Sequence, residues 1–398
     1  MQILDGNRAA AQGAKLARVQ VIAAYPITPQ TPVTESLSEF VEGGELSAEY
    51  IAVEGEHSAL AVCASASMVG ARTFTGTSSH GLAYMHEMLH WTAGARLPVV
   101  LACVNRAIGA PWNILNDQQD SISQRDTGWI QTYARNNQEI LDSIIQAYRI
   151  AETVYVPVMV CYDGYVLSHT EMPVDVPSQE AVDRFLPAYK PHTILDPATP
   201  KNYNLVTLAN PRVNTDGILC HGYMELRYLL QEALQNSRET ITKVGQEFGK
   251  QFGRDYSNML WEDKLDDADI VIVAMGSLAM EAIVAADMLR EQGHKVGVLG
   301  LRVFRPFPKS GVVEALQNAR LVLVFDKNIS YGLEGATCSE IKSALYGQRV
   351  NPVVRNFIVG LGGRDVKARE LAAAVNRSLP LLKEGALNAE YPEWVCHI

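Results

Sequence analysis

Cysteine is sparse in this sequence, and no two cysteines lie close together. The six cysteines are at positions 63, 103, 161, 220, 338 and 396, so the closest two are 40 residues apart. Zinc ribbons and iron–sulfur clusters are usually held by Cys-x-x-Cys pairs, and the sequence contains none. We therefore expect no metal cluster on this chain, and we interpret the cysteines as buried, reduced thiols of a cytoplasmic protein.

Basic clusters and long apolar runs are also scarce. The net charge is -10, and no group of lysines and arginines forms the positive surface that nucleic-acid binding requires. Residues 270–289 have the length of a membrane span, but they include Glu281 and Asp287 and the pair Gly276-Ser277. A buried strand, a turn and an amphipathic helix explain that stretch better. We expect a soluble protein that binds neither nucleic acid nor membranes.

Short apolar runs alternate with helical patterns along most of the chain, which is typical of α/β proteins with parallel sheets. The pattern predicts a first unit over residues 1–180 and a second over 263–398. Between them, residues 181–262 form an irregular, proline-rich stretch followed by a helix at 224–252. We interpret this stretch as an extension that wraps the surface or reaches a partner. The predicted strands are 19–24, 49–53, 72–75, 99–104, 158–161, 270–275, 295–299, 321–325 and 356–359, and the predicted helices include 56–69, 81–93, 138–152 and 280–291.

A proline-rich segment, Tyr-Pro-Ile-Thr-Pro-Gln-Thr-Pro at residues 25–32, follows the first predicted strand. Ligands of parallel α/β sheets bind at the carboxyl ends of strands. The hydroxyls of Thr28 and Thr31 and the free amide of Ile27 are therefore candidate ligand groups. The alternative is a rigid turn that binds nothing, and the residues alone favour neither.

An acidic segment, Glu-Gly-Glu-His-Ser-Ala at residues 54–59, follows the second predicted strand and opens a helix rich in small residues. An acidic residue in the first turn of a helix often only complements the helix dipole, which contributes about 0.3–1 kcal/mol. The small residues that follow would let another helix or a flat cofactor approach. Glu56 is therefore a candidate functional carboxylate.

Arg106 follows the buried strand at residues 99–104 and precedes a long polar loop over residues 116–128. An arginine in this position is either solvated or a fork for a carboxylate. A polar loop of this length usually lines a site rather than merely connecting elements.

Two further motifs have a functional and a structural interpretation. His86 and His90 fit H-E-x-x-H, the zinc-hydrolase helix. The third ligand of that class is missing from the expected spacing, so an ordinary packed helix is favoured. The glycines of residues 360–363 resemble a phosphate loop, but the G-x-G-x-x-G spacing is incomplete because residue 365 is Asp. A tight turn with positive φ is the safer interpretation.

The segments 25–32, 54–59, 77–82, 105–107 and 357–365, taken together and in this order, resemble the alpha subunit of pyruvate:ferredoxin oxidoreductases, in the 2-oxoacid:ferredoxin oxidoreductase family. The resemblance implies an α/β fold: a thiamine-pyrimidine-binding, doubly wound parallel-sheet domain followed by a transketolase-C-terminal-like α/β domain. It implies that Glu56 is the catalytic carboxylate that faces N1′ of the cofactor's aminopyrimidine. Other residues implied in cofactor binding are Pro26, Ile27 and Ser79, and those implied in substrate binding are Thr28 and Arg106.

The resemblance also implies partners, because the sequence has no Gly-Asp-Gly motif with the asparagine that holds Mg²⁺ and diphosphate in thiamine enzymes. A beta subunit would supply that site and a [4Fe–4S] cluster. Gamma and delta subunits, the latter with further clusters, would complete a complex that is expected to dimerise. The reaction implied is thiamine diphosphate-dependent oxidative decarboxylation of a 2-oxoacid to acyl-CoA, CO2 and reduced ferredoxin.

Substrate choice is the least determined part of this expectation. Pyruvate is favoured because a single arginine is evident and its neighbours are apolar, and a branched-chain or aryl (phenylglyoxylate-type) 2-oxoacid is the alternative. Two departures from the usual family pattern bear on that choice: Arg8 replaces a common acidic residue, and residues 117–120 read Asp-Gln-Gln-Asp where relatives often have Asp-His-Gln-Asp. The remote alternatives are a zinc hydrolase that uses His86 and His90, and a catalytically silent scaffold.

Overall fold

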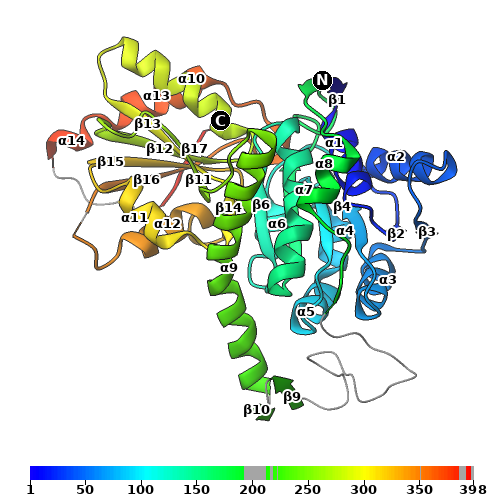
Figure 1. The fold of residues 1–398 in the computed structure, drawn as a ribbon. Helices are drawn as coiled ribbons and strands as arrows, with labels where there is room; N and C mark the ends of the chain where they lie inside the picture. The colour runs from blue at the N-terminus through cyan, green and yellow to red at the C-terminus, as the bar shows by residue number, and fades with distance from the viewer. Residues whose placement is uncertain (192–211, 216–217, 222, 350, 385–390, 396–398) are drawn as a thin grey trace.

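The computed structural model describes residues 1–191, 212–215, 218–221, 223–349, 351–384 and 391–395. Its first unit is built on a seven-stranded sheet (Figure 1). Neighbouring strands are parallel except at the edge formed by β14. The strand order is β14 (Val303–Arg305), β6 (Ile130–Tyr133), β7 (Val158–Asp163), β5 (Val100–Asn105), β4 (Thr73–Thr77), β2 (Val21–Ala24) and β3 (Glu49–Ala52).

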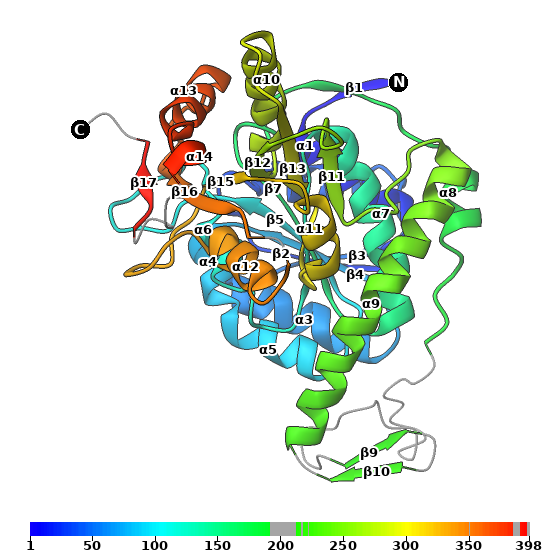
Figure 2. The same ribbon diagram turned by 90° about the vertical axis from the view of Figure 1, so that its left-hand side faces the viewer.

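Helices cover both faces of this sheet, as the alternating pattern predicts. On one face lie α1 (Gly6–Leu16) and α7 (Asn137–Val154), and on the other α3 (Glu56–Met68) and α5 (His86–Gly94) (Figure 2). The central strands β5 and β7 are buried throughout, which explains their continuous apolar sequences. The predicted helix at 81–93 is two helices, α4 (Ser79–Tyr84) and α5, separated at Met85.

The second unit has a six-stranded sheet, parallel except for its first strand. Helices α10 (Leu278–Glu291) and α13 (Ala368–Ser378) cover one face, and α11 (Lys309–Ala315) and α12 (Ala336–Leu345) lie on the other (Figure 1). The predicted α/β class is therefore confirmed for both units. The strand order is β11 (Leu260–Asp263), β13 (Val296–Leu301), β12 (Ile270–Met275), β15 (Leu321–Asp326), β16 (Val353–Ile358) and β17 (Glu393–Trp394).

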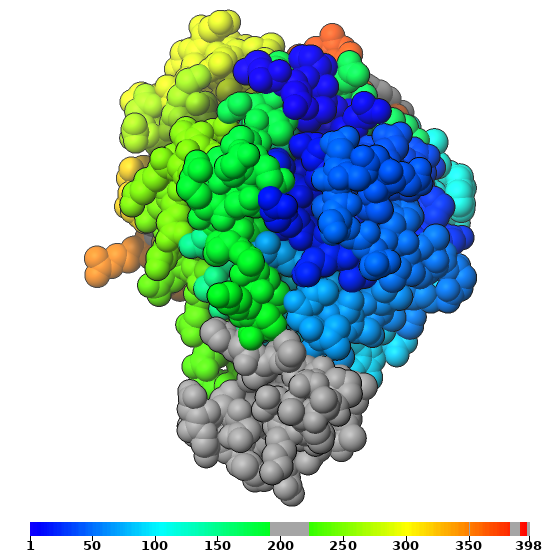
Figure 3. All heavy atoms as spheres, turned by 45° about the vertical axis from the view of Figure 1, so that its right-hand side comes forward, coloured from blue at the N-terminus to red at the C-terminus, as the bar shows by residue number. Residues whose placement is uncertain are grey.

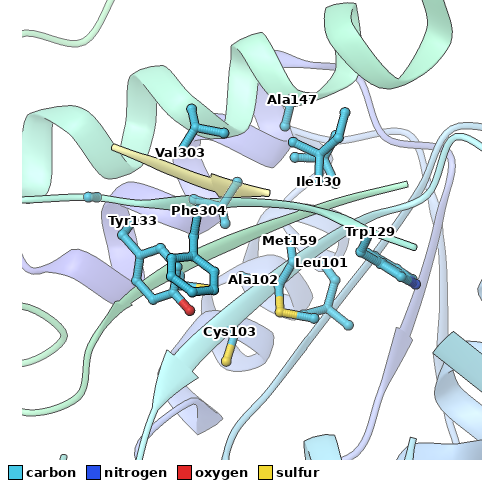
Figure 4. Close-up of a cluster of buried hydrophobic side chains, with 14 of the residues drawn as sticks. Leu101, Ala102, Cys103, Trp129, Ile130, Tyr133, Ala147, Met159, Val303 and Phe304 are labelled. Atoms are coloured by element: carbon cyan, nitrogen blue, oxygen red, sulfur yellow. The ribbon is translucent and has the colours of Figure 1, made fainter. Parts of the chain in front are cut away.

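The two units share a hydrophobic core. Strand β14 comes from the second half of the chain but pairs with β6 in the first sheet. Figure 4 shows Val303 and Phe304 of this region among side chains of the first unit. The Phe304 ring is fully buried and meets Tyr133 edge to face, with 6.3 Å between ring centroids. The units are therefore interlocked, and the boundaries at residues 180 and 262 stay a prediction.

The connecting region is dominated by α9 (Tyr223–Phe252), which confirms the predicted helix. Arg149 of α7 donates to Glu247 of α9 at 2.9 Å, and Phe248 meets Phe185 of α8 (Gln179–Phe185) edge to face. In Figure 3 the green surface of this region lies between the blue amino-terminal part and the yellow second unit. A short hairpin of β9 (Arg212–Thr215) and β10 (Ile218–His221) precedes α9, and the rest of 192–222 lies outside the described residues.

Several elements were not predicted. Helix α1 follows the short strand β1 (Gln2–Leu4), which pairs with β8 (Met172–Val174). Helix α2 (Thr31–Glu42) begins inside the proline-rich segment, with a proline in its first turn, where the missing N–H removes no helical hydrogen bond. Among the described helices, none combines the length and apolar composition of a membrane span.

Candidate active site

Four predicted site segments lie at one edge of the first sheet. Strands β5, β4, β2 and β3 are successive neighbours and run parallel, so their carboxyl ends meet at the same edge. Thr28 follows β2 and Glu56 follows β3. Ser79 follows β4 and Arg106 follows β5. This is the edge at which α/β sheets bind their ligands.

Glu56 is the first residue of α3, after Gly55 in extended conformation. Its side chain is 8% exposed, and no hydrogen bond or ion pair joins its carboxylate to the described residues. A Cβ atom on Gly81 would lie 2.5 Å from Oε1 of Glu56 and 2.5 Å from Oγ1 of Thr77. The glycine therefore allows the start of α4 to lie against the carboxylate.

Several buried polar atoms on and beside β4 have no partner among the described residues. The hydroxyls of Thr75, Thr77 and Ser78 and both polar atoms of the Gln30 amide lack a hydrogen-bond partner among the described residues. Gln30 lies against Gly76, whose Cβ would meet its Nε2 at 2.8 Å. Unpaired buried polar groups are costly. A polar cofactor bound at this edge would account for such a concentration, so the residues fit an aminopyrimidine.

Arg106 is 3% exposed, and other residues hold two of its three guanidinium nitrogens. Nη1 donates to the carbonyl of Thr28 at 2.8 Å, and Nε donates to the carbonyl of Asn113 at 3.1 Å. Nη2 is buried and has no partner among the described residues. The ring of Trp112 lies 5.1 Å from the guanidinium carbon. Burial lowers the pKa of Arg106, but an arginine stays charged in proteins. Arg106 therefore supplies a positive charge, and Nη2 is its one guanidinium nitrogen without a partner among the described residues.

The remaining predicted residues are arranged less simply. Thr28 and Pro26 are exposed, Ile27 is partly buried, and it is the carbonyl of Thr28, not its hydroxyl, that contacts Arg106. The Ser79 hydroxyl donates to the carbonyl of Ala107 at 2.5 Å, so it is already engaged. Whether these residues hold a cofactor or substrate stays a prediction.

Asp120 belongs to the polar loop of residues 116–128 and contacts the backbone of both Ser79 and Arg106. It lies in α6 (Gln119–Ile122), is fully buried, and accepts the backbone N–H groups of Ser79 and Arg106 at 2.9 Å each. Burial raises the pKa of Asp120 to about 7, although hydrogen bonds from Asn105, Ser79 and Arg106 act to lower it. The polar loop over residues 116–128 predicts a site in this region, but only the folded structure shows that Asp120 is the residue on which these donors meet.

A second buried carboxylate joins the two units. Asp163 ends β7 and accepts from Lys327 Nζ at 3.1 Å and from Asn116 Nδ2 at 3.0 Å. It also accepts from the backbone N–H of Ser277 at 2.9 Å and from its hydroxyl at 2.5 Å. Burial raises the pKa of Asp163, but the charge of Lys327 and the Ser277 donors outweigh it and the pKa is lowered.

The glycine loop of residues 360–363 is a turn, as predicted. Gly360, Gly362 and Gly363 all have positive φ. A Cβ on Gly363 would lie 2.3 Å from that of Leu115, and the Gly362 N–H donates to Asp117 at 3.0 Å. The loop therefore docks on the polar loop that carries the site residues of the first unit.

The H-E-x-x-H helix has a structural explanation. His86 Nδ1 lies 2.6 Å from Oε1 of Gln124, and the rings of His86 and His90 meet edge to face. Within the described part of the chain, no group of three or more His, Cys, Asp or Glu side chains could hold a metal ion. His86 is exposed and His90 is partly buried, so the pair lies near the surface, and the contacts of the two rings are with Gln124 and with each other.

Comparisons with known proteins identify the family of this chain. The family model "Pyruvate flavodoxin/ferredoxin oxidoreductase, thiamine diP-bdg" matches residues 12–244. The model "Pyruvate:ferredoxin oxidoreductase core domain II" matches residues 268–371. Among solved structures, the chain is similar in fold to a 2-oxoglutarate:ferredoxin oxidoreductase from Magnetococcus marinus, with a TM-score of 0.72 and 19% identity over 95% of this chain and 65% of that chain. A split-gene transketolase matches with a TM-score of 0.54.

The matched family models define an oxidoreductase subunit with a thiamine diphosphate-binding domain. Curated relatives narrow this class. Pyruvate synthase subunit PorA of Methanocaldococcus jannaschii is 50% identical over 94% of this chain and 94% of its own length. Ketoisovalerate oxidoreductase subunit VorA of Pyrococcus horikoshii is 47% identical over 99% of this chain and 97% of its own. The chain belongs to the 2-oxoacid:ferredoxin oxidoreductase family, as an alpha subunit.

Proposed function

We propose that this chain activates thiamine diphosphate and binds the substrate carboxylate in a complex that oxidises pyruvate to acetyl-CoA, CO2 and reduced ferredoxin. The observation that carries the proposal is the partnerless carboxylate of Glu56, held at the same sheet edge as Arg106. Bound thiamine diphosphate would supply the carbanion that attacks the 2-oxoacid.

Glu56 is proposed to accept a hydrogen bond from N1′ of the aminopyrimidine. A carboxylate with no competing partner in its own chain is available for that proton. Its place at a helix start is compatible with a charged form, because the amino-terminal end of a helix favours negative charge. Pro26, Ile27 and Ser79 are proposed to line the pyrimidine from the neighbouring strand ends, Ser79 through its position rather than its engaged hydroxyl.

Arg106 and Thr28 are proposed to hold the carboxylate of the 2-oxoacid. The free Nη2 of Arg106 is the donor that the substrate would meet, and the Thr28 carbonyl fixes the guanidinium at 2.8 Å. Charge-assisted hydrogen bonds of this kind are about twice as strong as neutral ones.

The other components are proposed to come from partners. A beta subunit would hold the diphosphate with Mg²⁺ and a [4Fe–4S] cluster, and gamma and delta subunits would add further clusters in a complex that dimerises. The four cysteines whose surroundings are described, Cys63, Cys103, Cys161 and Cys338, are buried free thiols, and none of them belongs to a group of three or more His, Cys, Asp or Glu side chains that could hold a metal ion. The related 2-oxoglutarate enzyme was solved with coenzyme A and succinyl-CoA bound, which supports coenzyme A as the acyl acceptor.

The alternative substrate is a branched-chain 2-oxoacid, because the similar proteins include both pyruvate and ketoisovalerate enzymes. The deciding experiment is to purify the native complex and measure kcat/KM with ferredoxin for pyruvate, 2-oxoisovalerate and phenylglyoxylate. We expect bound thiamine diphosphate, iron and the highest kcat/KM with pyruvate. A higher kcat/KM with 2-oxoisovalerate would change the proposed substrate and leave the proposed type of reaction unchanged. Stoichiometric zinc without thiamine diphosphate would overturn the proposal.

A further inference from the structure

Asp120 has an unusual set of partners for a buried carboxylate. The residue is 0% exposed, and its hydrogen bonds come from four N–H groups and, at 3.9 Å, from the thiol of Cys103, but not from a cationic side chain. Oδ2 accepts from the backbone N–H groups of Ser79 and Arg106, and Oδ1 accepts from Asn105 Nδ2 at 2.7 Å and from the Ser121 N–H at 2.8 Å. Burial of a charge is costly unless it is hydrogen-bonded in this way.

The two N–H donors to Oδ2 belong to two different segments of the site edge. Ser79 begins α4 after β4, and its φ of 50° lies in the left-handed region that a serine rarely adopts. Arg106 follows the adjacent strand β5. A single oxygen, Oδ2 of Asp120, holds both N–H groups and therefore fixes the spacing of the two segments.

Arg106 is consequently fixed at both ends. Asp120 holds its backbone N–H, while the carbonyls of Thr28 and Asn113 hold Nη1 and Nε. Only Nη2 is left unpartnered among the described residues. A side chain that is already held in place before the ligand arrives loses little conformational entropy on binding. The ligand then binds more tightly and in a defined orientation.

We propose that Asp120 is a positioning residue for substrate binding, which acts by fixing Arg106 and the Ser79 turn in one arrangement. This inference rests on the proposed function, because it takes Arg106 to be the group that binds the substrate carboxylate. Asp120 itself touches neither substrate nor cofactor.

Asp120→Asn tests this role in the purified complex. The amide keeps the size but replaces one acceptor oxygen with a donor, so at least one N–H group at the site meets another N–H. We expect KM for the 2-oxoacid to rise by about 10–100-fold, the effect of displacing a binding group by about 1 Å. kcat at saturation should change less than KM, and thiamine diphosphate should remain bound, since its diphosphate is held elsewhere.

Asp326→Asn is a matched control. Asp326 is 1% exposed and also accepts backbone N–H groups, those of Thr337 and Cys338 at 3.1 and 3.2 Å, but it lies in the second unit. The control should lose stability in the same way and leave KM unchanged. An equal rise of KM in both variants would show a general structural effect and would overturn the positioning role.

A double-mutant cycle separates this inference from the proposed function. In the Arg106→Ala background, the substrate carboxylate has lost its partner, so adding Asp120→Asn should raise KM no further. Additive effects on KM would contradict the positioning role. If Arg106→Ala alone leaves KM unchanged, the carboxylate assignment under the proposed function fails instead. Should Asp120→Asn not fold, Asp120→Ser is smaller, keeps one oxygen acceptor and serves in the same cycle.

Discussion

At the scale of single residues, Glu56 and Arg106 differ from the other charged groups of the site because each has a polar atom without a hydrogen-bond partner among the described residues. The buried carboxylates Asp120 and Asp163 are both saturated by hydrogen bonds from their own chain. The Glu56 carboxylate and the Nη2 atom of Arg106 have no such partner among the described residues. A buried donor without a partner, such as Nη2 of Arg106, is rare in folded proteins. These two charged groups are therefore the best candidates for contacts with cofactor and substrate.

Glu56→Gln tests whether this carboxylate activates the cofactor. The amide keeps the size of the side chain but cannot stabilise a proton on N1′. We expect hydrogen–deuterium exchange at C2 of bound thiamine diphosphate to slow by roughly 10²–10⁴-fold, the usual contribution of a general acid–base group. If Glu56 only complements the helix dipole, the change costs about 1 kcal/mol or less of stability and exchange stays normal in the assembled complex.

Arg106→Ala tests the carboxylate site. Removal of a charge-assisted contact should lower kcat/KM for the 2-oxoacid by about 2–4 kcal/mol. Cofactor content should be retained, because the guanidinium is not proposed to touch the diphosphate. Steady-state kinetics with cofactor analysis of the same preparation checks both points, and an unchanged KM would exclude Arg106 as the main carboxylate ligand.

At the scale of elements, runs of apolar residues predict where the buried strands lie. They do not predict which strands pair when the two are far apart in the sequence. Strands β5, β7, β12 and β15 are buried throughout, so uninterrupted apolar runs identify them. Strand β14 has three residues and joins the first sheet from the other half of the chain. Its partner is set by tertiary contact alone, which no local periodicity records. The same limit applies to Asp120: its loop is visible in the sequence, but the backbone N–H groups that it accepts lie 14 and 41 residues away.

Helix α4 lies against the start of α3 at the Glu56 carboxylate, because Gly81 has no side chain. Gly81→Ala tests whether this close approach is needed. Alanine is a better helix former than glycine by about 1 kcal/mol, so propensity alone predicts a gain. The new Cβ would however lie 2.5 Å from Oε1 of Glu56, and the carboxylate must move. We expect C2 exchange to slow by about 10–100-fold.

Gly94→Ala is the matched control for that change. Its Cβ would meet no atom closer than Nη1 of Arg227 at 3.5 Å, an ordinary contact with a flexible side chain. This variant should be as active as the unmodified complex. Equal exchange rates in the Gly81→Ala and Gly94→Ala complexes would show that Glu56 tolerates displacement.

At the scale of the whole molecule, polar contacts hold the second unit against the site. The Gln118 N–H donates to the carbonyl of Lys327 at 2.8 Å, and the Gly363 N–H donates to that of Asn116 at 2.6 Å. Asp163 adds the buried ion pair with Lys327. The second unit therefore contacts the loop that carries Asp120, through Lys327 and Gly363.

Lys327→Met breaks the ion pair between the units. Lys327 and Asp163 have side chains 7% and 1% exposed, so the variant leaves a buried carboxylate without its cation. Loss of one partner of a buried pair costs about 3–5 kcal/mol, and the complex should melt at a clearly lower temperature. Lys264→Met is the control, because Lys264 and its partner Asp287 are 40% and 50% exposed and such surface pairs contribute about 0–1 kcal/mol.

The pH dependence of the Lys327→Met effect identifies its cause. In the unmodified protein the pKa of Asp163 is lowered, since Lys327 and Ser277 outweigh burial. A carboxyl group with a lowered pKa stabilises the fold above its unfolded pKa, and this stabilisation is lost as pH falls through the folded pKa. Without Lys327 the pKa of Asp163 should rise, so the variant is penalised most at neutral pH, where the carboxylate would be charged. The melting-temperature difference from the unmodified complex should therefore shrink as the pH is lowered toward the usual pKa of an aspartate, about 4. A difference that stays constant from neutral pH to that value would mean that lost packing of the lysine stem, and not the ion pair, causes the destabilisation.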